Sequence, residues 1–206
     1  MTEVEQTKLF NEVWENPAIY ALIHAPEARV LFDIASELPE GSLIVEIGCY
    51  EGKSTSVLAS VADRRNLKLY CVDPLLPFIQ DIHTAKDGPF NGGVPVTEET
   101  LEVFKRNILD VYKNVTWAGY GVTSEEAAKT MNEPIDFIFL DADHSYAACK
   151  IDCESWLPKL KPGHCATFHD INNVAFIGVQ HAVEEYCVGW KEVNSVWNLK
   201  TFRKPM

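Results

Sequence analysis

Acidic and histidine side chains gather at two points of the chain where a buried strand is expected to end. They are Asp141, Asp143 and His144 after one apolar run, and His169 and Asp170 after the next. Adjacent parallel strands lie about 4.8 Å apart, so side chains at the two ends can share one oxygen-rich pocket. Two or more carboxylates with a few waters suit Mg²⁺, and a histidine in the set also permits Mn²⁺, Fe²⁺ or Zn²⁺. The pattern indicates a pocket able to hold a divalent cation, with structural capping or a metal-free site as the alternative.

The elements that must position these residues alternate along the chain. Strands are expected over residues 43–47, 67–72, 114–118, 136–140 and 164–168, and helices over 53–62, 98–111, 124–131, 146–158 and 179–186. This alternation favours a parallel sheet with helices on both faces. Before it, residues 5–38 are expected to form two or three helices broken around Pro17 and Pro26, and residues 190–203 should form two final strands.

A glycine loop follows the first expected strand. Gly48 and Gly52 let the backbone turn sharply and come close to a ligand. Ser54 or Thr55 can then cap the free N–H groups at the start of the next helix. A strand, a glycine turn and a helix start form the nucleotide-side corner of a doubly wound α/β domain.

Two interpretations of this loop predict different ligands. A phosphate-binding P-loop needs four residues between its first glycine and the Gly-Lys pair, whereas three separate Gly48 from Gly52 here. Glu46 and Glu51 would also flank the phosphates, where negative charge is unfavourable. A carboxylate-lined loop suits a cofactor with no phosphate and some positive charge. S-adenosylmethionine fits, because it carries an ammonium, a sulfonium and a ribose diol.

The second expected strand ends in an acid, Asp73, which lies 25 residues after Gly48. At the tip of that strand a carboxylate can accept hydrogen bonds from both ribose hydroxyls. A turn aspartate before Pro74 is the alternative, and such turns are common. The glycine loop upstream favours the ribose role.

Taken together, these motifs resemble the class I S-adenosylmethionine-dependent methyltransferases. More narrowly, they resemble the group that includes small-molecule and sugar O-methyltransferases and cephalosporin hydroxylase-like proteins. The matching segments are residues 45–55, 70–73, 134–146, 156–163 and 168–170. The resemblance implies a Rossmann-like methyltransferase fold, a doubly wound, mostly parallel seven-stranded α/β sheet that ends in an antiparallel hairpin.

The resemblance also implies roles for the residues at the strand ends. In metal-dependent members, an aspartate after strand four and two adjacent residues after strand five hold the ion. Asp141 and Asp170 match, and His169 stands where better-known members have a carboxylate. We predict that these three residues bind Mg²⁺ or Mn²⁺.

His144 lies three residues beyond Asp141, where related sugar O-methyltransferases place a catalytic base. A neutral imidazole with a pKa of about 6.5 can accept a hydroxyl proton. We therefore predict that His144 and Asp141 are catalytic. The alternative is a turn histidine that only orients Asp141 or another ligand.

Contacts with S-adenosylmethionine are predicted from the glycine loop and from the strand ends. The residues are Glu46, Gly48, Gly52, Ser54, Asp73, Thr123, Ser124 and Asp141. Residues 118–124 form a turn at a place that commonly flanks the adenine ring in this fold. Thr123 or Ser124 is expected to cap the following helix. An ordinary helix start with acids in its first turn explains the same residues equally well.

The irregular stretch 74–97 is rich in Pro, Gly, Asp and Asn. A connection this long between a strand and a helix is often a functional loop. Its place after the second strand puts it over the site, so it can touch the methyl acceptor. The candidates are Phe78, His83, Phe90 and Asn91.

Composition bounds the class of protein. A chain of 206 residues is expected to form a single domain, with a helical segment at 1–39 and an α/β core at 40–206. The net charge of −12 disfavours a nucleic-acid or anionic-membrane surface, and no apolar run approaches the ~20 residues of a membrane span. The acidic start is not a signal peptide. Six cysteines without a Cys-x-x-Cys pair favour reduced thiols and a cytoplasmic protein.

We therefore predict an S-adenosylmethionine-dependent O-methyltransferase that acts on a small hydroxylated metabolite with the help of a divalent ion. One alternative is a non-methylating relative, such as a hydroxylase-like or cofactor-binding protein. The other is a P-loop nucleotide hydrolase, which the loop spacing disfavours. The N-terminal helices could also form the contact of a homodimer.

Overall fold

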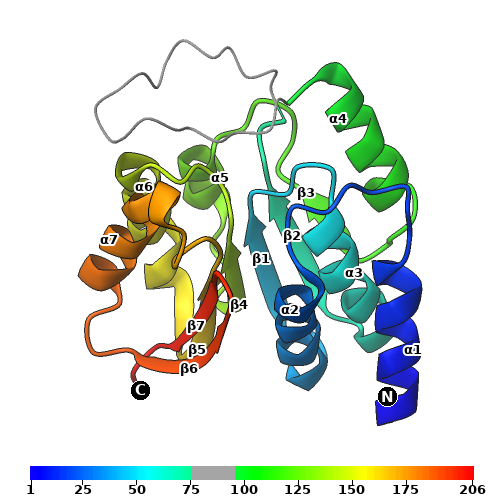
Figure 1. The fold of residues 1–206 in the computed structure, drawn as a ribbon, viewed down its shortest axis with the longest axis horizontal. Helices are drawn as coiled ribbons and strands as arrows, with labels where there is room; N and C mark the ends of the chain where they lie inside the picture. Colours follow the sequence, from blue (N-terminus) through cyan, green and yellow to red (C-terminus); the bar gives the residue numbers. More distant parts are fainter. Residues whose placement is uncertain (76–95) are drawn as a thin grey trace.

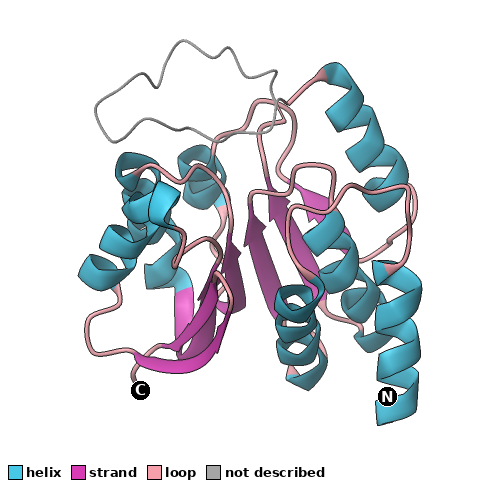
Figure 2. Cartoon of the chain, in the orientation of Figure 1, coloured by secondary structure: helices cyan, strands magenta, loops and turns pink. Residues whose placement is uncertain are grey.

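The fold is built around a seven-stranded sheet with helices packed on both faces (Figures 1 and 2). The computed structural model describes residues 1–75 and 96–206. The strands are β1 (Leu43–Ile47), β2 (Lys68–Val72), β3 (Val115–Trp117), β4 (Ile135–Leu140), β5 (Leu160–Phe168), β6 (Lys191–Val196) and β7 (Leu199–Arg203). Their order in the sheet is β3-β2-β1-β4-β5-β7-β6.

Among the strands of the described residues, β7 alone runs against its neighbours, since it pairs antiparallel with β5 and β6 while the remaining pairs are parallel. The strand order reverses between β1 and β4, where ligands bind in doubly wound sheets. The predicted doubly wound, mostly parallel seven-stranded sheet is confirmed.

The helices form one layer on each face of the sheet. They are α1 (Glu3–Trp14), α2 (Ala25–Glu37), α3 (Lys53–Arg65), α4 (Glu98–Phe104), α5 (Ser124–Thr130), α6 (Tyr146–Trp156) and α7 (Ile177–Tyr186). The first four pack on one face and the last three on the other (Figure 1). Strand β1 is buried on both faces: Ile44 contacts the first layer, and Val45 and Ile47 contact the second. This is the pattern of a central parallel strand.

The predicted elements are close to the observed ones, with two informative differences. Pro26 does not break a helix but lies in the first turn of α2, where the N–H that proline lacks would have no partner. Strand β5 begins at Leu160, earlier than expected, because Leu160 pairs with Ile135 of β4 ahead of a register shift. A π-helix, Lys105–Leu109, continues α4.

Two further observations bear on the predictions. The acceptor candidates Phe78, His83, Phe90 and Asn91 lie outside the described residues. No helix in the described ranges 1–75 and 96–206 is long and apolar enough to cross a membrane.

Candidate functional site

The glycine loop after β1 does not have the geometry of a phosphate loop. The Lys53 ammonium group donates to the backbone carbonyls of Trp14 (2.6 Å) and Asn16 (3.1 Å), and it lies 4.9 Å from the centre of the Trp14 ring. The cation that a P-loop directs at phosphates therefore holds the N-terminal segment instead. Glu51 faces the same way, since its carboxylate accepts the N–H of Tyr20 at 3.2 Å.

Gly52, and neither Ser54 nor Thr55, caps the helix that follows the loop. Helix α3 begins at Lys53, and Gly52 has the left-handed conformation with φ of 93°. The prediction that Ser54 or Thr55 caps the helix is therefore wrong. The reason is that the Ser54 hydroxyl donates to Glu46 at 2.5 Å, beneath the loop.

Both loop glycines are required by packing within the protein. A Cβ on Gly48, whose φ is 88°, would overlap the Asp141 carbonyl oxygen and lie 2.8 Å from Cα of Ala142. A Cβ on Gly52 would lie 2.5 Å from Cγ1 of Ile108. The close approach expected for a ligand is thus made by the end of β4 and by the π-helix. Cofactor contacts at these glycines stay a prediction.

Asp73 ties the end of β2 to the glycine loop. One carboxylate oxygen accepts the N–H groups of Cys49 (2.8 Å) and Tyr50 (2.9 Å), and the other accepts the N–H of Leu75 (2.9 Å). A carboxylate has about four acceptor positions, so three are occupied by backbone. Asp73 therefore performs the predicted turn role. A ribose hydroxyl would have to bind at the remaining acceptor position of the carboxylate or displace one of these N–H groups.

Glu46 lies beneath the loop with none of its surface exposed. Its carboxylate accepts from Ser54, and the Cys71 thiol lies 3.9 Å away. Burial, with the charges of Asp141 and Asp73, raises the pKa of Glu46 to about 7 against the hydrogen bond from Ser54. Glu46 and Ser54 are thus buried against each other and support the loop from below, and their contact with the cofactor stays a prediction.

The raised pKa of Glu46 predicts a pH-dependent stability. The folded state keeps the proton between about pH 4.5 and 7 while the unfolded state has lost it, so stability falls as pH rises through this window. We expect wild type to lose about 2–3 kcal/mol more than Glu46→Gln between about pH 5 and pH 8. Urea unfolding of both proteins measures this difference, and equal pH profiles would contradict it.

The turn before α5 is held next to the end of β2. The N–H of Gly121 donates to the carbonyl of Pro74 at 2.8 Å. Thr123 caps α5, which confirms one of the two predicted caps. The Ser124 hydroxyl instead accepts the indole N–H of Trp156 at 2.8 Å. The predicted adenine role of this turn is not tested by these contacts, but the structure does bring the turn to the predicted ribose position.

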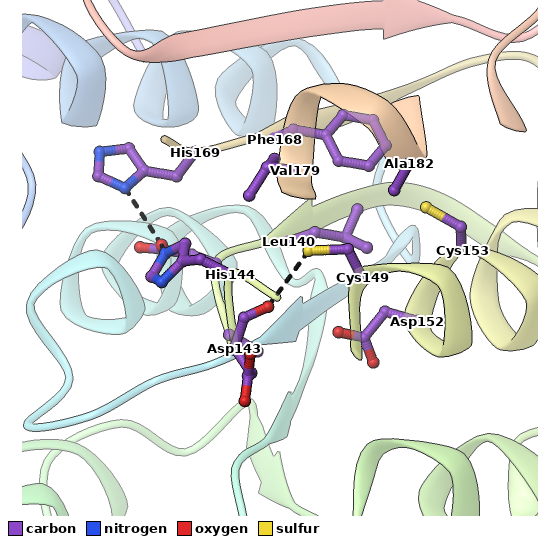
Figure 3. A pocket seen from close by; sticks show the side chains of 12 residues that line it. Leu140, Asp143, His144, Cys149, Asp152, Cys153, Phe168, His169, Val179 and Ala182 are labelled. Carbon is purple, nitrogen blue, oxygen red and sulfur yellow. Dashed lines mark hydrogen bonds and ion pairs between the residues drawn. The ribbon is translucent and has the colours of Figure 1, made fainter. Parts of the chain in front are cut away.

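The ends of β4 and β5 bring Asp141, His144, His169 and Asp170 together, as the sequence predicts. His169 Nδ1 lies 3.1 Å from Asp141 Oδ1 and 3.3 Å from Asp170 Oδ2. His144 Nε2 lies 3.2 Å from Asp170 Oδ2 and 3.6 Å from Asp141 Oδ1. Figure 3 shows both imidazoles at this corner of the site. We call these four residues the strand-end cluster.

Backbone strain supports the placement of Asp170. Its φ of 55° lies in the left-handed region, which only glycine enters freely. The side chain is held by the Asn173 amide group, which donates to Oδ1 at 3.1 Å. Strain of this kind persists where surrounding contacts fix it, and it is concentrated at functional sites.

The charges of the cluster determine its protonation. Burial lowers the pKa of both histidines, but the carboxylates of Asp141 and Asp170 outweigh it, raising the pKa of His144 to about 9 and that of His169 to about 12. Burial opposes ionisation of Asp170, yet the histidines hold its pKa well below the usual range. In the cluster alone, the carboxylates therefore favour the protonated form of both imidazoles.

Glu27 is a member of the site that the sequence reasoning missed. It lies in the first turn of α2 with no exposed surface, and its Oε2 is 3.4 Å from His169 Nε2. Its local pattern, an acid in a helix first turn after His24, predicts only a capping role, which it also performs. Nothing in the sequence indicates a contact between residues this far apart in the chain.

Aromatic rings lie against two histidines of this region, one of them in the strand-end cluster. Phe176 stacks on the His144 imidazole with ring centres 4.2 Å apart. Trp197, in the β6–β7 turn, lies 4.4 Å from the His24 ring and is 60% exposed. Behind the cluster, between β4, β5, α6 and α7, is a cavity of about 20 Å³ lined by Leu140, Phe168 and Val179, among others (Figure 3). It has room for about one water and none for a cofactor.

The strand order, the antiparallel β7, the glycine loop after β1 and the acid after β2 define a class I S-adenosylmethionine-dependent methyltransferase. The chain belongs to the methyltransferase domain family, whose model matches residues 45–171, more than half of its length.

Similar solved structures agree with this fold. One is the O-methyltransferase NovP, with a TM-score of 0.77, 14% identity and coverage of 98% of this chain and 99% of that one. Another is the calicheamicin methyltransferase CalS11, with a TM-score of 0.61, 15% identity and coverage of 98% and 92%. A third is an O-methyltransferase from Bacillus cereus in complex with SAH, with a TM-score of 0.59, 15% identity and coverage of 99% and 92%.

Proposed function

We propose that the protein transfers the methyl group of S-adenosylmethionine to a hydroxyl group of a small acceptor, assisted by a divalent cation at Asp141, His169 and Asp170. The observation that carries this proposal is the strand-end cluster beside the glycine loop. Gly48 packs directly on the backbone of Asp141, so the loop that would hold the cofactor adjoins the carboxylates that would hold the acceptor.

The cluster fits a cation. His144 Nε2 is buried and has no hydrogen-bond partner among the described residues, although two carboxylate oxygens lie within 3.6 Å. That nitrogen would stay free to accept a proton, while donor atoms of Asp141, His169 and Asp170 lie within 4.8 Å of one another and suit a divalent cation. A divalent cation bound there would lower the pKa of the acceptor hydroxyl and fix its orientation.

We assign the role of general base to His144 in this proposal. In the proposed reaction the acceptor oxygen forms a bond to the methyl carbon as the carbon–sulfur bond breaks, and the hydroxyl proton passes to Nε2 of His144. The products are S-adenosylhomocysteine, a methyl ether and the protonated imidazole. His144 must be neutral to act in this way, and engagement of Asp141 and Asp170 by a cation would remove the charges that raise its pKa.

The acceptor class is supported by the relatives and by the rim of the site. NovP is described as an O-methyltransferase and CalS11 as a TDP-rhamnose 3′-O-methyltransferase. Phe176, which stacks on His144, would offer apolar surface to a small molecule there. A cytoplasmic location, a homodimer and the absence of nucleic-acid and membrane partners stay predictions.

Binding of the cofactor is tested first. S-adenosylmethionine at 100 times its dissociation constant is expected to stabilise the protein by about 2.7 kcal/mol. For a chain of this size, the melting temperature rises by about 5–10 °C. Differential scanning fluorimetry measures the shift, with ATP as the control ligand. A shift with ATP and none with S-adenosylmethionine would overturn the cofactor assignment.

Turnover then separates a methyltransferase from a non-methylating relative. Methyl transfer from labelled cofactor to a panel of sugars, catechols and polyketides is expected to label at least one acceptor at oxygen. Cofactor binding without labelling across such a panel would favour the hydroxylase-like or cofactor-binding alternative.

A further inference from the structure

We infer that Glu27 and His169 form a dyad that makes the cation site select a first-row transition ion over Mg²⁺. This inference rests on the proposed function for the location of the site. It adds the identity of the ion and the role of Glu27, which reaches the strand-end cluster from helix α2.

The first observation is the position of the two ring nitrogens of His169. Nδ1 lies between the two cluster carboxylates, 3.1 Å from Asp141 Oδ1 and 3.3 Å from Asp170 Oδ2. The three donor atoms lie within 4.8 Å of one another. A cation held by Asp141 and Asp170 would therefore meet a nitrogen of His169.

The second observation is that Glu27 cannot turn away from His169. Its Oε2 accepts the N–H of His24 at 3.0 Å and faces His169 Nε2 at 3.4 Å, while its Oε1 accepts the N–H of Asn198 at 3.0 Å. A carboxylate fixed opposite one imidazole nitrogen keeps the proton on that nitrogen, so the lone pair is presented by the other. With a cation between Asp141 and Asp170, Glu27 would thus direct the Nδ1 lone pair of His169 toward that ion.

Three carboxylates, those of Glu27, Asp141 and Asp170, reach one corner of the site around His169. A divalent ion bound there would offset part of this negative charge.

The donor set decides which ion is preferred. Mg²⁺ takes oxygen ligands in near-ideal octahedral geometry and gives up its waters reluctantly. Imidazole nitrogen binds later first-row ions more strongly, in the order of affinity that rises from Mn²⁺ to Co²⁺ and beyond. With His169 Nδ1 in the set and His144 Nε2 at its edge, Co²⁺ and Mn²⁺ should bind more tightly than Mg²⁺.

Titration calorimetry of the chelator-treated full-length protein with Mg²⁺, Mn²⁺ and Co²⁺ tests the selectivity without any turnover. We expect Co²⁺ to bind at least about tenfold more tightly than Mg²⁺ in wild type. Glu27→Gln is expected to weaken Co²⁺ binding by about 10–100-fold, the usual effect of losing a carboxylate that orients a metal-bound histidine. His181→Asp, at an exposed histidine of α7, is the control and should leave both affinities unchanged.

The double variant Glu27→Gln/His169→Asp replaces the His169 nitrogen with carboxylate oxygens, so all the donor atoms at these three positions are oxygens. The change at Glu27 avoids placing two charged carboxylates next to each other. We expect its preference for Co²⁺ over Mg²⁺ to fall by about tenfold or more from the wild-type value. Mg²⁺ binding as tight as Co²⁺ in wild type, or an unchanged ratio in a folded double variant, would overturn the inference. If Glu27→Gln does not fold, His169→Asn provides the same comparison.

Failure here can be told apart from failure of the proposed function. Binding of S-adenosylmethionine is measured on the same metal-free protein. If the wild type binds the cofactor but shows no selectivity for Co²⁺, only this inference is overturned. If the wild type does not bind the cofactor at all, the proposed function is contradicted.

Discussion

Replacement of His144 by glutamine is expected to slow methyl transfer by about 10²–10⁴-fold, the usual contribution of a general base. Glutamine keeps a polar side chain of similar reach but cannot take a proton. Single-turnover rates with bound labelled cofactor measure the chemical step. Affinity for S-adenosylmethionine should stay near the wild-type value, because His144 contacts the carboxylates at the ends of β4 and β5 and not the glycine loop.

A metal titration of the same variant separates the two roles open to His144. Retained metal affinity with slow chemistry is the result expected of a base. Parallel loss of metal would make His144 a ligand, a role that its unpartnered Nε2 also permits. A wild-type rate in His144→Gln would remove both roles. His181→Gln, on the exposed side of α7, is the matched control for replacing a histidine by glutamine.

Gly48→Ala is expected to cost about 3–5 kcal/mol of stability, because a left-handed residue acquires a Cβ and that Cβ overlaps the backbone of β4's end. For a chain of this length the melting temperature should fall by about 10–15 °C. Neither Asp141 nor Ala142 can move aside easily, since the N–H of Asp141 is bonded to the carbonyl of Ile47 at 2.8 Å. Thermal and urea unfolding measure the loss.

Gly189→Ala provides the control for the conformational part of this cost. Gly189 also has a positive φ, 77°, but a Cβ there would meet nothing within 4 Å. Its substitution should cost only the left-handed penalty, about 1–2 kcal/mol. Equal losses at the two glycines would mean that the contact between the loop and the end of β4 contributes nothing.

Much of the fold could be predicted from local sequence. Apolar runs such as 136–140 and helix starts such as Thr123 carry their own signals in periodicity and capping chemistry. The strand-end cluster was also predictable, because parallel strands place their carboxyl ends at one edge. To place Asp141 and Asp170 at that edge, it was enough to predict where β4 and β5 end.

The remaining features depend on contacts between distant segments. The direction of Lys53 is set by carbonyls near Trp14, and the partner of Ser54 is a carboxylate on β1. Glu27 reaches His169 only because α2 packs beside the end of β5 and the β6–β7 turn. From local patterns, such residues are expected to cap helices or to face solvent. The residues adjacent in sequence do not indicate which distant side chain will be the partner in the fold.

The segment between α1 and α2 makes the N-terminal helices hard to exchange as a module. It is held to the glycine loop by Lys53 and Glu51, and its last residue, His24, shares Glu27 with the strand-end cluster. A chimera that imports the N-terminal helices of a relative would therefore disturb the glycine loop and the strand-end cluster as well. Such an exchange should move residues 1–27 together with their partners at 51, 53 and 169.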